Sequence, residues 1–492
     1  MNCFAVFHVL FFCNFPCHRG VTINQTQNAK VLDRIVGCFV GAACGDALGA
    51  PFEFGPPLSK DIVLEMVGGG LFGWKPGQFT DDTEMAVSIA RALYAQPKLG
   101  AYAHLDMLVE DWCIWAKQAK DVGVQTRSVL NSISAHTEQE ARAKAQQFHE
   151  LFGGRSGGNG GLMRAFPVAL AFPEDPNGLI EMTRRSVQIT HWEKDAYEAA
   201  ILWNLAIRTS YIQRELNLKD QLIHLPESSR RIWEQRIIEA ETKQPVDFTQ
   251  SNGWVVSAFQ AAWSAIHHTN SFVDAITLAI QAGGDTDTVA CITGALAGSF
   301  YGYSAIPESW RFYLNGFDGI DQMGLVRLAL SSQAAIYAGQ QINDWPFVEH
   351  MPTTSQSFLV KHPHDEGLLL GNLAAIDMEN TEKVVLCRIG KDQTIYPVHN
   401  FWLIDEPMTN NNLLFTFQDC IKTIYRLRQE GNRVLLCCQA GLSRTPAMAI
   451  AYSVLVHDID IETAIAEVFD IIPHARPLEE FLNAITELEK VV

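Results

Sequence analysis

Apolar residues recur every three or four positions through the first two thirds of the chain, a spacing that predicts amphipathic helices. Glycine-rich joints separate these helical segments, and the stretch from Arg208 to Gln250 is more charged, so we expect it to be a solvated excursion. The pattern predicts a mostly helical region from about Ala29 to Gly339. The expected helices are Asp33–Ala47, Thr83–Tyr94, Leu105–Ala119, Asp195–Tyr211, Trp254–His267, Phe272–Ile280 and Thr288–Tyr301.

The helical rhythm stops near Gln340, where prolines and a Thr-Thr-Ser run indicate a linker over residues 340–356. Short apolar runs then alternate with helical segments, which predicts a small α/β domain over residues 357–492. The strand-like runs are Gly367–Leu370, Val384–Leu386, Phe401–Ile404 and Val434–Cys437, and the helical segments are Phe415–Glu430, Pro446–His457 and Leu478–Val491.

Composition narrows the possible partners. The chain has 492 residues, too many for one ordinary core, and its 37 basic and 55 acidic residues give a net charge of -18, which opposes binding to nucleic acid or an anionic membrane. Its eleven cysteines form no CxxC pair, as expected for a reduced, cytoplasmic protein. Residues 1–29 are interpreted as an N-terminal extension, because their apolar stretch lacks a basic flank and is too short to span a membrane; a weak export signal is the minority alternative.

Two acidic clusters carry the first candidate chemistry. Thr80-Asp81-Asp82-Thr83 and Asp285-Thr286-Asp287-Thr288 each mix carboxylates with hydroxyls in front of a helical segment. Either cluster alone is explained at least as well by helix N-capping. If the clusters meet in the fold, their carboxylates repel by roughly 4 kcal/mol per pair at 4 Å unless they protonate or bind cations. Oxygen ligands of this kind favour Mg²⁺ or Mn²⁺ over zinc.

The motifs around these clusters follow a known order. A small-residue segment from Gly37 to Glu53, FTDDTEMA, SGGNGGLMR, Thr190-His191 and AGGDTDTVACITGALAGSFYG occur in succession. Together they resemble the ADP-ribosylglycohydrolase family, the dinitrogenase-reductase-activating type, over Lys30 to Gly339. The resemblance implies an all-α bundle that binds two divalent cations, Mg²⁺ or Mn²⁺. Carried over, the metal ligands are Thr80, Asp81, Asp82, Asp285, Asp287 and Thr288.

The same resemblance implies the remaining site residues. Glu53 matches a family acid near the ions and the ribose, and Asp121 matches a loop in which some members place a catalytic acid, although a helix cap explains Asp121 equally well. The glycine-rich stretch fits a backbone cradle for a diphosphate, because glycines expose N–H groups. The expected substrate-binding residues of this site are Ser156, Gly158, Asn159, Gly160 and His191; a lone histidine such as His191 is more often structural.

A second site is predicted where the run Val434–Cys437 ends. Cys438 follows the run, Arg444 lies six residues later, and a helical segment begins at once. A cysteine beside a helix N-terminus has a lowered pKa and can act as a nucleophile, and an arginine can hold two phosphoryl oxygens.

This loop, with Gly441 and Thr445, resembles the dual-specificity branch of the cysteine-dependent protein phosphatases over about Ser357 to Val492. The resemblance implies that Cys438 attacks phosphorus, Arg444 binds the transferred group and Thr445 steadies the thiolate. Asp405, 33 residues before Cys438, would be the general acid.

One position departs from the family, which has histidine where this chain has Cys437. Phosphatase activity could therefore be reduced, or Cys437 and Cys438 could form a protective disulfide on oxidation.

The chain is thus expected to be multidomain, an all-α ADP-ribosylglycohydrolase-like bundle over residues 30–339 followed by a small α/β cysteine-phosphatase domain. The expected partners are an ADP-ribosylated protein or a small ADP-ribosyl substrate, and a phosphoprotein, with no nucleic acid and no membrane. An inactive, phosphate-binding C-terminal domain is the alternative. The ADP-ribosyl linkage, the choice between Mg²⁺ and Mn²⁺, the phosphatase substrate and the oligomeric state stay open.

Overall fold

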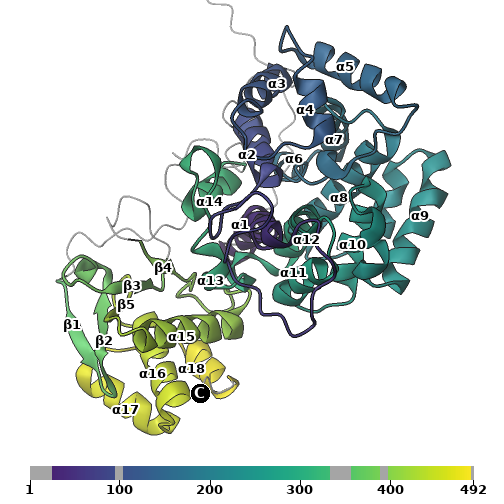
Figure 1. Cartoon of the computed structure of the whole chain (residues 1–492). Coiled ribbons are helices and arrows are strands. Elements are labelled where there is room, and N and C mark those ends of the chain that lie inside the picture. Colours follow the sequence, from purple (N-terminus) through teal and green to yellow (C-terminus); the bar gives the residue numbers. More distant parts are fainter. Residues whose placement is uncertain (1–24, 95–102, 333–355, 388–396, 489–492) are drawn as a thin grey trace, which may run out of the picture.

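The computed structural model describes residues 25–94, 103–332, 356–387 and 397–488. A helical body is followed by a smaller domain built on a sheet, and the two lie side by side (Figure 1). This arrangement confirms the predicted fold class. The helices of the body are α1 Gln25–Gly49, α2 Asp81–Tyr94, α3 Ala103–Trp115, α4 Val124–Leu130, α5 Glu138–Leu151, α6 Pro167–Ala171, α7 Pro176–Gln188, α8 Lys194–Gln213, α9 Glu227–Thr242, α10 Val255–His267, α11 Phe272–Gln281, α12 Thr286–Tyr301, α13 Glu308–Arg311 and α14 Gln322–Ser331.

Every helix predicted from apolar spacing in the body is present, with shifted ends. The charged stretch after Arg208 is less solvated than expected, because α9 buries Trp233 and Ile237 completely. Trp233 packs edge-on against Phe259 of α10, with ring centroids 5.1 Å apart. A single tryptophan anchors this charged helix to the core, so the charge of the segment was a poor guide to its burial.

Helices α1 and α12 lie side by side in the middle of the body (Figure 1) and run antiparallel, touching through glycines. A Cβ atom added to Gly45 would lie 2.0 Å from the carbonyl oxygen of Ala290, and one added to Gly298 would lie 2.0 Å from that of Gly37. Any larger residue would push the helices apart. The small-residue spacing in the sequence indicated this close approach, and it brings the C-terminal end of α1 to the N-terminal end of α12.

The smaller domain has a five-stranded sheet in the order β1-β2-β5-β3-β4. Strands β2, β5, β3 and β4 are parallel, and β1 pairs antiparallel with β2 at the edge. The elements are β1 Leu359–His362, β2 Asp365–Asn372, β3 Glu382–Val385, β4 His399–Asn400, α15 Leu413–Gln429, β5 Val434–Cys438, α16 Arg444–His457, α17 Ile461–Ile471 and α18 Glu479–Thr486. Parallel strands present their carboxyl ends at one edge, where Cys438 lies.

The expected strand at Phe401–Ile404 is wrong, because regular pairing ends at Asn400. Phe401 and Leu403 enter the core of the α/β domain, whereas Trp402 between them enters the core of the helical body. The side chains of this segment point alternately to two sides, as in a strand. One side is buried in the α/β domain and the other is covered by the helical body.

The predicted N-terminal extension and linker lie mostly outside the described residues. The predicted linker, residues 340–356, falls outside the described residues except for Gln356, as do residues 1–24 of the predicted extension; α1 already begins at Gln25. Ala29–Phe52 is long and apolar enough to cross a membrane, but 89% of its most apolar window is buried inside the protein. Among the described residues, such burial is typical of a core helix.

Candidate functional sites

Helix α2 is capped from outside by Asp46 of α1. Its carboxylate accepts hydrogen bonds from the backbone nitrogens of Thr80 (2.9 Å) and Thr83 (3.1 Å) and from the hydroxyl of Thr83 (2.6 Å). The first amides of α2 are therefore satisfied by a neighbouring helix. As a consequence, Asp81 and Asp82 are not needed as caps, and their carboxylates are left for another role.

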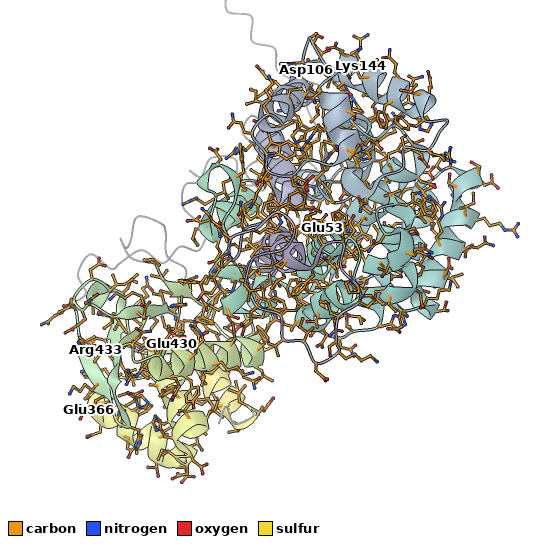
Figure 2. All side chains as sticks on the ribbon, in the orientation of Figure 1. Glu53, Asp106, Lys144, Glu366, Glu430 and Arg433 are labelled. Carbon is orange, nitrogen blue, oxygen red and sulfur yellow. The ribbon has the colours of Figure 1, made fainter. Side chains whose placement is uncertain are left out.

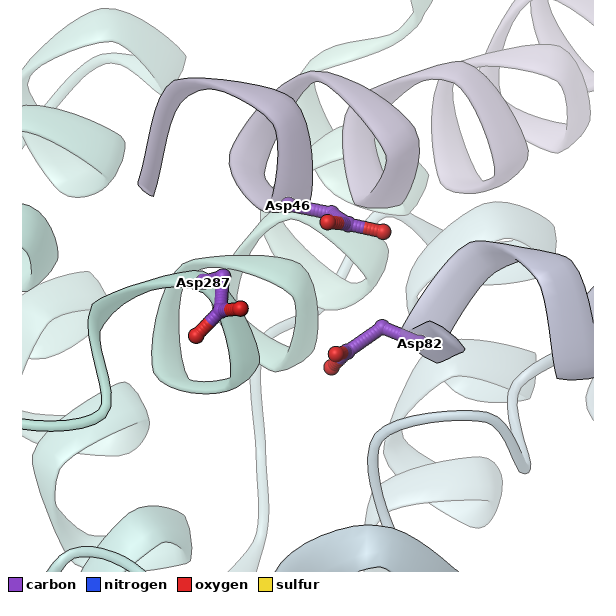
Figure 3. Close-up of side chains that lie close together, drawn as sticks. All are labelled: Asp46, Asp82 and Asp287. Carbon is purple, nitrogen blue, oxygen red and sulfur yellow. The ribbon is translucent and has the colours of Figure 1, made fainter. Parts of the chain in front are cut away.

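Three helices bring carboxylates together at one point. Asp46 of α1, Asp82 of α2 and Asp287 of α12 point toward one another (Figure 3), with one oxygen from each within 4.8 Å of the others. All three are buried. The two acidic clusters, far apart in sequence, thus meet in the fold, as the hypothesis of a shared site requires.

A second group adjoins the first through Asp287. Glu53, Asp285 and Asp287 also offer oxygens within 4.8 Å of one another. Glu53 lies inside the helical body, whereas the labelled Glu366 and Arg433 belong to the α/β domain (Figure 2). Glu53 Oε2, Asp82 Oδ1 and Asp285 Oδ1 are buried and accept no hydrogen bond from described residues. Buried carboxylate oxygens without donors fit cations, because an uncompensated buried anion is costly.

Asp285 occupies the N-cap position of α12 but its side chain makes no capping bond. Its carboxylate instead accepts from the amide of Asn159 (2.7 Å), and its backbone nitrogen donates to Asn252 (3.1 Å). The capping interpretation is therefore wrong for Asp285. Asn159, predicted to bind substrate, reaches the acid cluster and orients one of its members.

Crowding and burial change the protonation of the acids. Burial, reinforced by neighbouring carboxylates, raises the pKa of Asp81, Asp82 and Asp287 well above the ordinary value for aspartate. Burial, with Asp285 and Asp121 nearby, raises the pKa of Glu53 to about 8. Protons or cations must therefore balance the cluster at neutral pH. The donor set of carboxylates and hydroxyls fits hard divalent cations.

Glu53, Asp81, Asp285 and Asp287 line one side of a cleft with a volume of about 410 Å³. Asp121 and Val122, from the loop between α3 and α4, form another wall, and burial raises the pKa of Asp121. The predicted cap role of Asp121 fails, because the N-cap of α4 is Gly123. Of the residues predicted from the sequence, the cleft is lined by Glu53, Asp81, Asp121, Gly158, Asn159, Gly160, His191, Asp285, Asp287 and Thr288.

The His191 ring packs against the glycine loop at Gly158 and Gly160. A Cβ added to Gly158 would lie 3.2 Å from His191 Nε2, and one added to Gly160 would lie 3.1 Å from its Cε1. Burial and the nearby Arg164 lower the pKa of His191 well below its usual value, so the ring is neutral. Thr190 Oγ1 accepts from Arg164 (2.5 Å) and lies 2.8 Å from His191 Nδ1. This relay fixes the ring against the loop.

Three predicted residues, Ser156, Thr80 and Asp82, lie outside the lining of the cleft. The Ser156 backbone nitrogen donates to Glu193 (2.9 Å) and its hydroxyl lies 2.7 Å from His149 Nδ1. Ser156 therefore holds the start of the glycine loop in place. Thr80 is fully buried behind Asp82 and donates its hydroxyl to that carboxylate (3.2 Å).

Sequence reasoning missed two residues of this site. Asp46 is the main one, and its only signal was an acid one turn before Gly49 in a helix of otherwise small residues. Gln125 also lines the cleft and donates to the carbonyl of Thr190 (2.9 Å). Nothing in its local sequence distinguishes Gln125 from an ordinary polar residue of a helix.

The second site lies where β5 leads into α16. The Gly441 nitrogen donates to Cys438 Sγ (3.3 Å), and Gly441 has a φ of 72°, a conformation that favours glycine. Arg444 is buried, and its Nη1 donates to the carbonyl of Leu403 (2.9 Å). The structure thus curls the loop around the thiol and holds the arginine beside it.

Asp405 and Thr445 complete the predicted set. The Asp405 carboxylate accepts from the hydroxyl of Ser443 (2.5 Å) and lies 3.9 Å from Arg444 Nε. The Thr445 hydroxyl donates to the carbonyl of Gly371 (3.3 Å), which ties the start of α16 to β2. Asp405 is therefore beside the cysteine loop although it is distant in sequence.

The proposed disulfide between Cys437 and Cys438 is wrong for the folded chain. Successive side chains of a strand point to opposite faces, and the two cysteines lie in different clusters on either side of the sheet. Both are free. Cys437, where the phosphatase family has histidine, is buried among apolar residues such as Leu435 and Val385.

An all-helical body with converging acids in a cleft, joined to an α/β domain with a cysteine-arginine loop, defines a two-domain hydrolase. Residues 27–338 match the family described as ADP-ribosylglycohydrolase, and residues 374–491 match that described as dual specificity phosphatase, catalytic domain. The chain belongs to the ADP-ribosylglycohydrolase family and carries a dual-specificity phosphatase domain after it.

Curated relatives match the helical body. The ADP-ribosylarginine hydrolase Tri1 of Serratia proteamaculans is 31% identical over 302 residues, covering 57% of this chain and 75% of the relative. The ADP-ribosylhydrolase ARH3 of Homo sapiens is 29% identical over 347 residues, covering 60% of this chain and 92% of the relative. These findings support one glycohydrolase and one phosphatase activity in the same chain.

Proposed function

We propose that the helical body releases ADP-ribose from ADP-ribosylated protein, with arginine as the favoured linkage, and that it uses two divalent cations, Mg²⁺ or Mn²⁺. The arginine linkage is supported by the likeness to ADP-ribosylarginine hydrolase Tri1. The observation that carries the metal dependence is the set of buried oxygens without donors on Glu53, Asp82 and Asp285.

The ions would be held by the residues of the two acidic clusters. When bound, they supply positive charge that orients ribose hydroxyls and lowers the pKa of an attacking water. Asp46 fixes the N-terminus of α2, and Asn159 fixes Asp285, so the ligand oxygens are held before any substrate arrives. The proposed ligands are Thr80, Asp81, Asp82, Asp285, Asp287 and Thr288.

Glu53 and Asp121 are the proposed proton carriers. Cleavage at C1 of ribose builds oxocarbenium-like charge, and one carboxyl group must accept a proton from water or donate one to the leaving group. Glu53 lies beside Asp285 and Asp287, and Asp121 lines the same cleft, so both carboxyl groups are within the site. The backbone of Gly158 and Gly160 offers N–H groups to the diphosphate, above the neutral His191.

The test compares Asp285→Ala with Asp274→Ala, an exposed aspartate on α11. ADP-ribose released from an arginine-modified protein is measured with Mg²⁺, Mn²⁺ or chelator. We expect Asp285→Ala and chelation each to remove most activity, and Asp274→Ala to retain it. Release that survives Asp285→Ala would refute the metal mechanism. Release only from another ADP-ribosyl linkage would overturn the arginine assignment.

We further propose that the α/β domain is a protein phosphatase acting on phosphotyrosine, phosphoserine or phosphothreonine. Cys438 Sγ forms a bond to phosphorus as the phosphorus–oxygen bond of the ester breaks, and Asp405 protonates the departing oxygen; water then releases phosphate from the cysteine. The carrying observation is the convergence of Cys438, Arg444 and Asp405 on one loop.

Cys438→Ser in the full chain should abolish aryl phosphate turnover and leave ADP-ribose release intact, while Asp285→Ala should do the reverse. Each variant is then the control for the other. A specific alternative comes from Cys437, whose thiol is a weak hydrogen-bond donor and is buried among apolar side chains, where the family has histidine. If the wild-type chain binds a phosphopeptide without turnover, the domain is a phosphate-binding module.

A further inference from the structure

The segment that leads to Asp405 is held by both domains. Trp402 belongs to the core of the helical body and packs on Tyr303, with ring centroids 4.2 Å apart. Its neighbours Phe401 and Leu403 are fully buried in the core of the α/β domain. The backbone between two such anchors has little freedom to move, because either displacement would open a packed core.

Polar contacts reinforce this anchor. Arg311, at the end of α13, donates Nη1 to the carbonyl of Asn400 (2.6 Å) and to the hydroxyl of Tyr303 (2.6 Å). One residue earlier, His399 Nδ1 lies 2.6 Å from Glu308 Oε1. Arg311, Tyr303 and Glu308 all belong to the helical body, and all are buried. Buried hydrogen bonds to a charged group are among the stronger ones.

The far side of the Asp405 loop is anchored to the same body. Asn411 donates to Asp33 (2.8 Å) and to the carbonyl of Lys30 (3.1 Å) at the start of α1. Asn412 donates to the carbonyl of Tyr301 (2.7 Å) and to the hydroxyl of Ser304 (2.8 Å), just after α12. Asn412 occupies the N-cap position of α15, yet its side chain makes no capping bond there.

The loop between these anchors, residues 404–410, is held by hydrogen bonds between its two ends and contacts the cysteine loop. Asn410 accepts from the nitrogen of Ile404 (2.9 Å) and donates to its carbonyl (3.0 Å). On the other side, the carbonyl of Leu403 accepts from Arg444 and Asp405 accepts from Ser443. The position of Asp405 beside Ser443 and Arg444 of the cysteine loop thus depends on the contacts that hold residues 399–403 and 411–412.

We propose that the helical body positions the general acid of the phosphatase, with Arg311, Asn411 and Asn412 as positioning residues. The inference rests on the proposed phosphatase function. In the reaction, the proton of Asp405 passes to the leaving oxygen as Cys438 Sγ bonds to phosphorus. Loosening the anchors at Asn411 and Asn412, which lie beyond Asp405, leaves the nucleophile in place but moves the proton donor.

The kinetic signature of a displaced general acid differs from that of a damaged fold. General acid catalysis contributes on the order of 10²- to 10⁴-fold, and only to leaving groups that need a proton. A displacement of about 1 Å can cost about 100-fold. Phenyl phosphate has a basic leaving group and depends on the acid. The leaving group of 2,4-dinitrophenyl phosphate departs as a stable anion and does not.

The experiment uses the full chain with Asn412→Ala, and Asn217→Ala as a matched control on a half-buried asparagine of the helical body, whose side chain donates to Asp220 three residues away. We expect Asn412→Ala to lower kcat for phenyl phosphate about 10- to 100-fold and kcat for 2,4-dinitrophenyl phosphate less than about twofold. KM should not change, and the basic limb of the pH–rate profile should flatten, as in Asp405→Asn. Asn217→Ala should match wild type.

ADP-ribose release and thermal unfolding report whether each variant is folded. If Asn412→Ala does not fold, Arg311→Lys replaces it, since lysine keeps the charge but loses the guanidinium group that joins the carbonyls of Ile306 (3.1 Å) and Asn400 (2.6 Å). Equal losses for the two esters would overturn the inference while leaving the phosphatase assignment standing. Failure of the wild-type chain to hydrolyse either ester would refute the phosphatase reaction, and the positioning role with it.

Discussion

Replacing Asp46 by alanine tests whether this residue, to which the sequence assigned no role, holds the acidic cluster together. The carboxylate is the acceptor for the backbone nitrogens of Thr80 and Thr83, both buried at the start of α2. Without it, two buried N–H groups lose their partner, at about 1–3 kcal/mol each. We therefore expect Asp46→Ala to lower the free energy of unfolding of the helical body by about 2–6 kcal/mol.

Asp46→Asn separates the hydrogen bonds from the charge. Asparagine keeps one acceptor oxygen for the α2 amides and removes a carboxylate whose pKa burial raises to about 6. Its destabilisation should be less than half that of Asp46→Ala. Urea unfolding in chelator, followed by helical circular dichroism, measures both variants. The reasoning would fail if alanine changed the free energy of unfolding by less than about 0.5 kcal/mol, or if asparagine were the more harmful replacement.

Two other expectations follow from the contact between α1 and α12 and from the raised pKa values of the buried acids. Gly298→Ala should destabilise the body by about 3 kcal/mol or more, since its Cβ would meet the carbonyl of Gly37 at 2.0 Å; an unchanged thermal midpoint would show that α1 and α12 can separate at little cost. The raised pKa values of Glu53, Asp82 and Asp287 mean that the cation-free fold binds more protons than the unfolded chain, so its stability falls as pH rises from about 4 towards about 8. Adding Mn²⁺ should therefore raise the unfolding temperature more at about pH 8 than at about pH 5, and an equal rise at both would contradict the crowding argument.

The sequence predicted the helices that carry a regular apolar stripe, and the structure has them. It could not show the burial of α9, because one tryptophan, Trp233, outweighs a largely charged surface. It could not place a strand at Phe401–Ile404 correctly, since the alternation there is shared between two domains. Periodicity reports which residues are buried, but not what buries them.

Site prediction had a similar limit. Residues within the motifs, such as Asp285 and Gly160, reach the cleft as expected. Ser156 belongs to the same run of residues but turns away to His149 and Glu193. Asp46 was missed because its partners, Thr80 and Thr83, are joined to it only through the packing of α1 against α2.

The glycine contact between α1 and α12 also sets an order of events during synthesis. The two helices are far apart in the chain, so the body cannot complete its core until α12 has left the ribosome. The residues Tyr303 and Arg311, which contact the phosphatase segment, are synthesised directly after α12. The phosphatase segment is synthesised after them. Trp402 of the phosphatase segment completes the core of the helical body, so the last folding step joins the two domains, and a chain truncated before α12 would expose an unfinished core to chaperones and proteases.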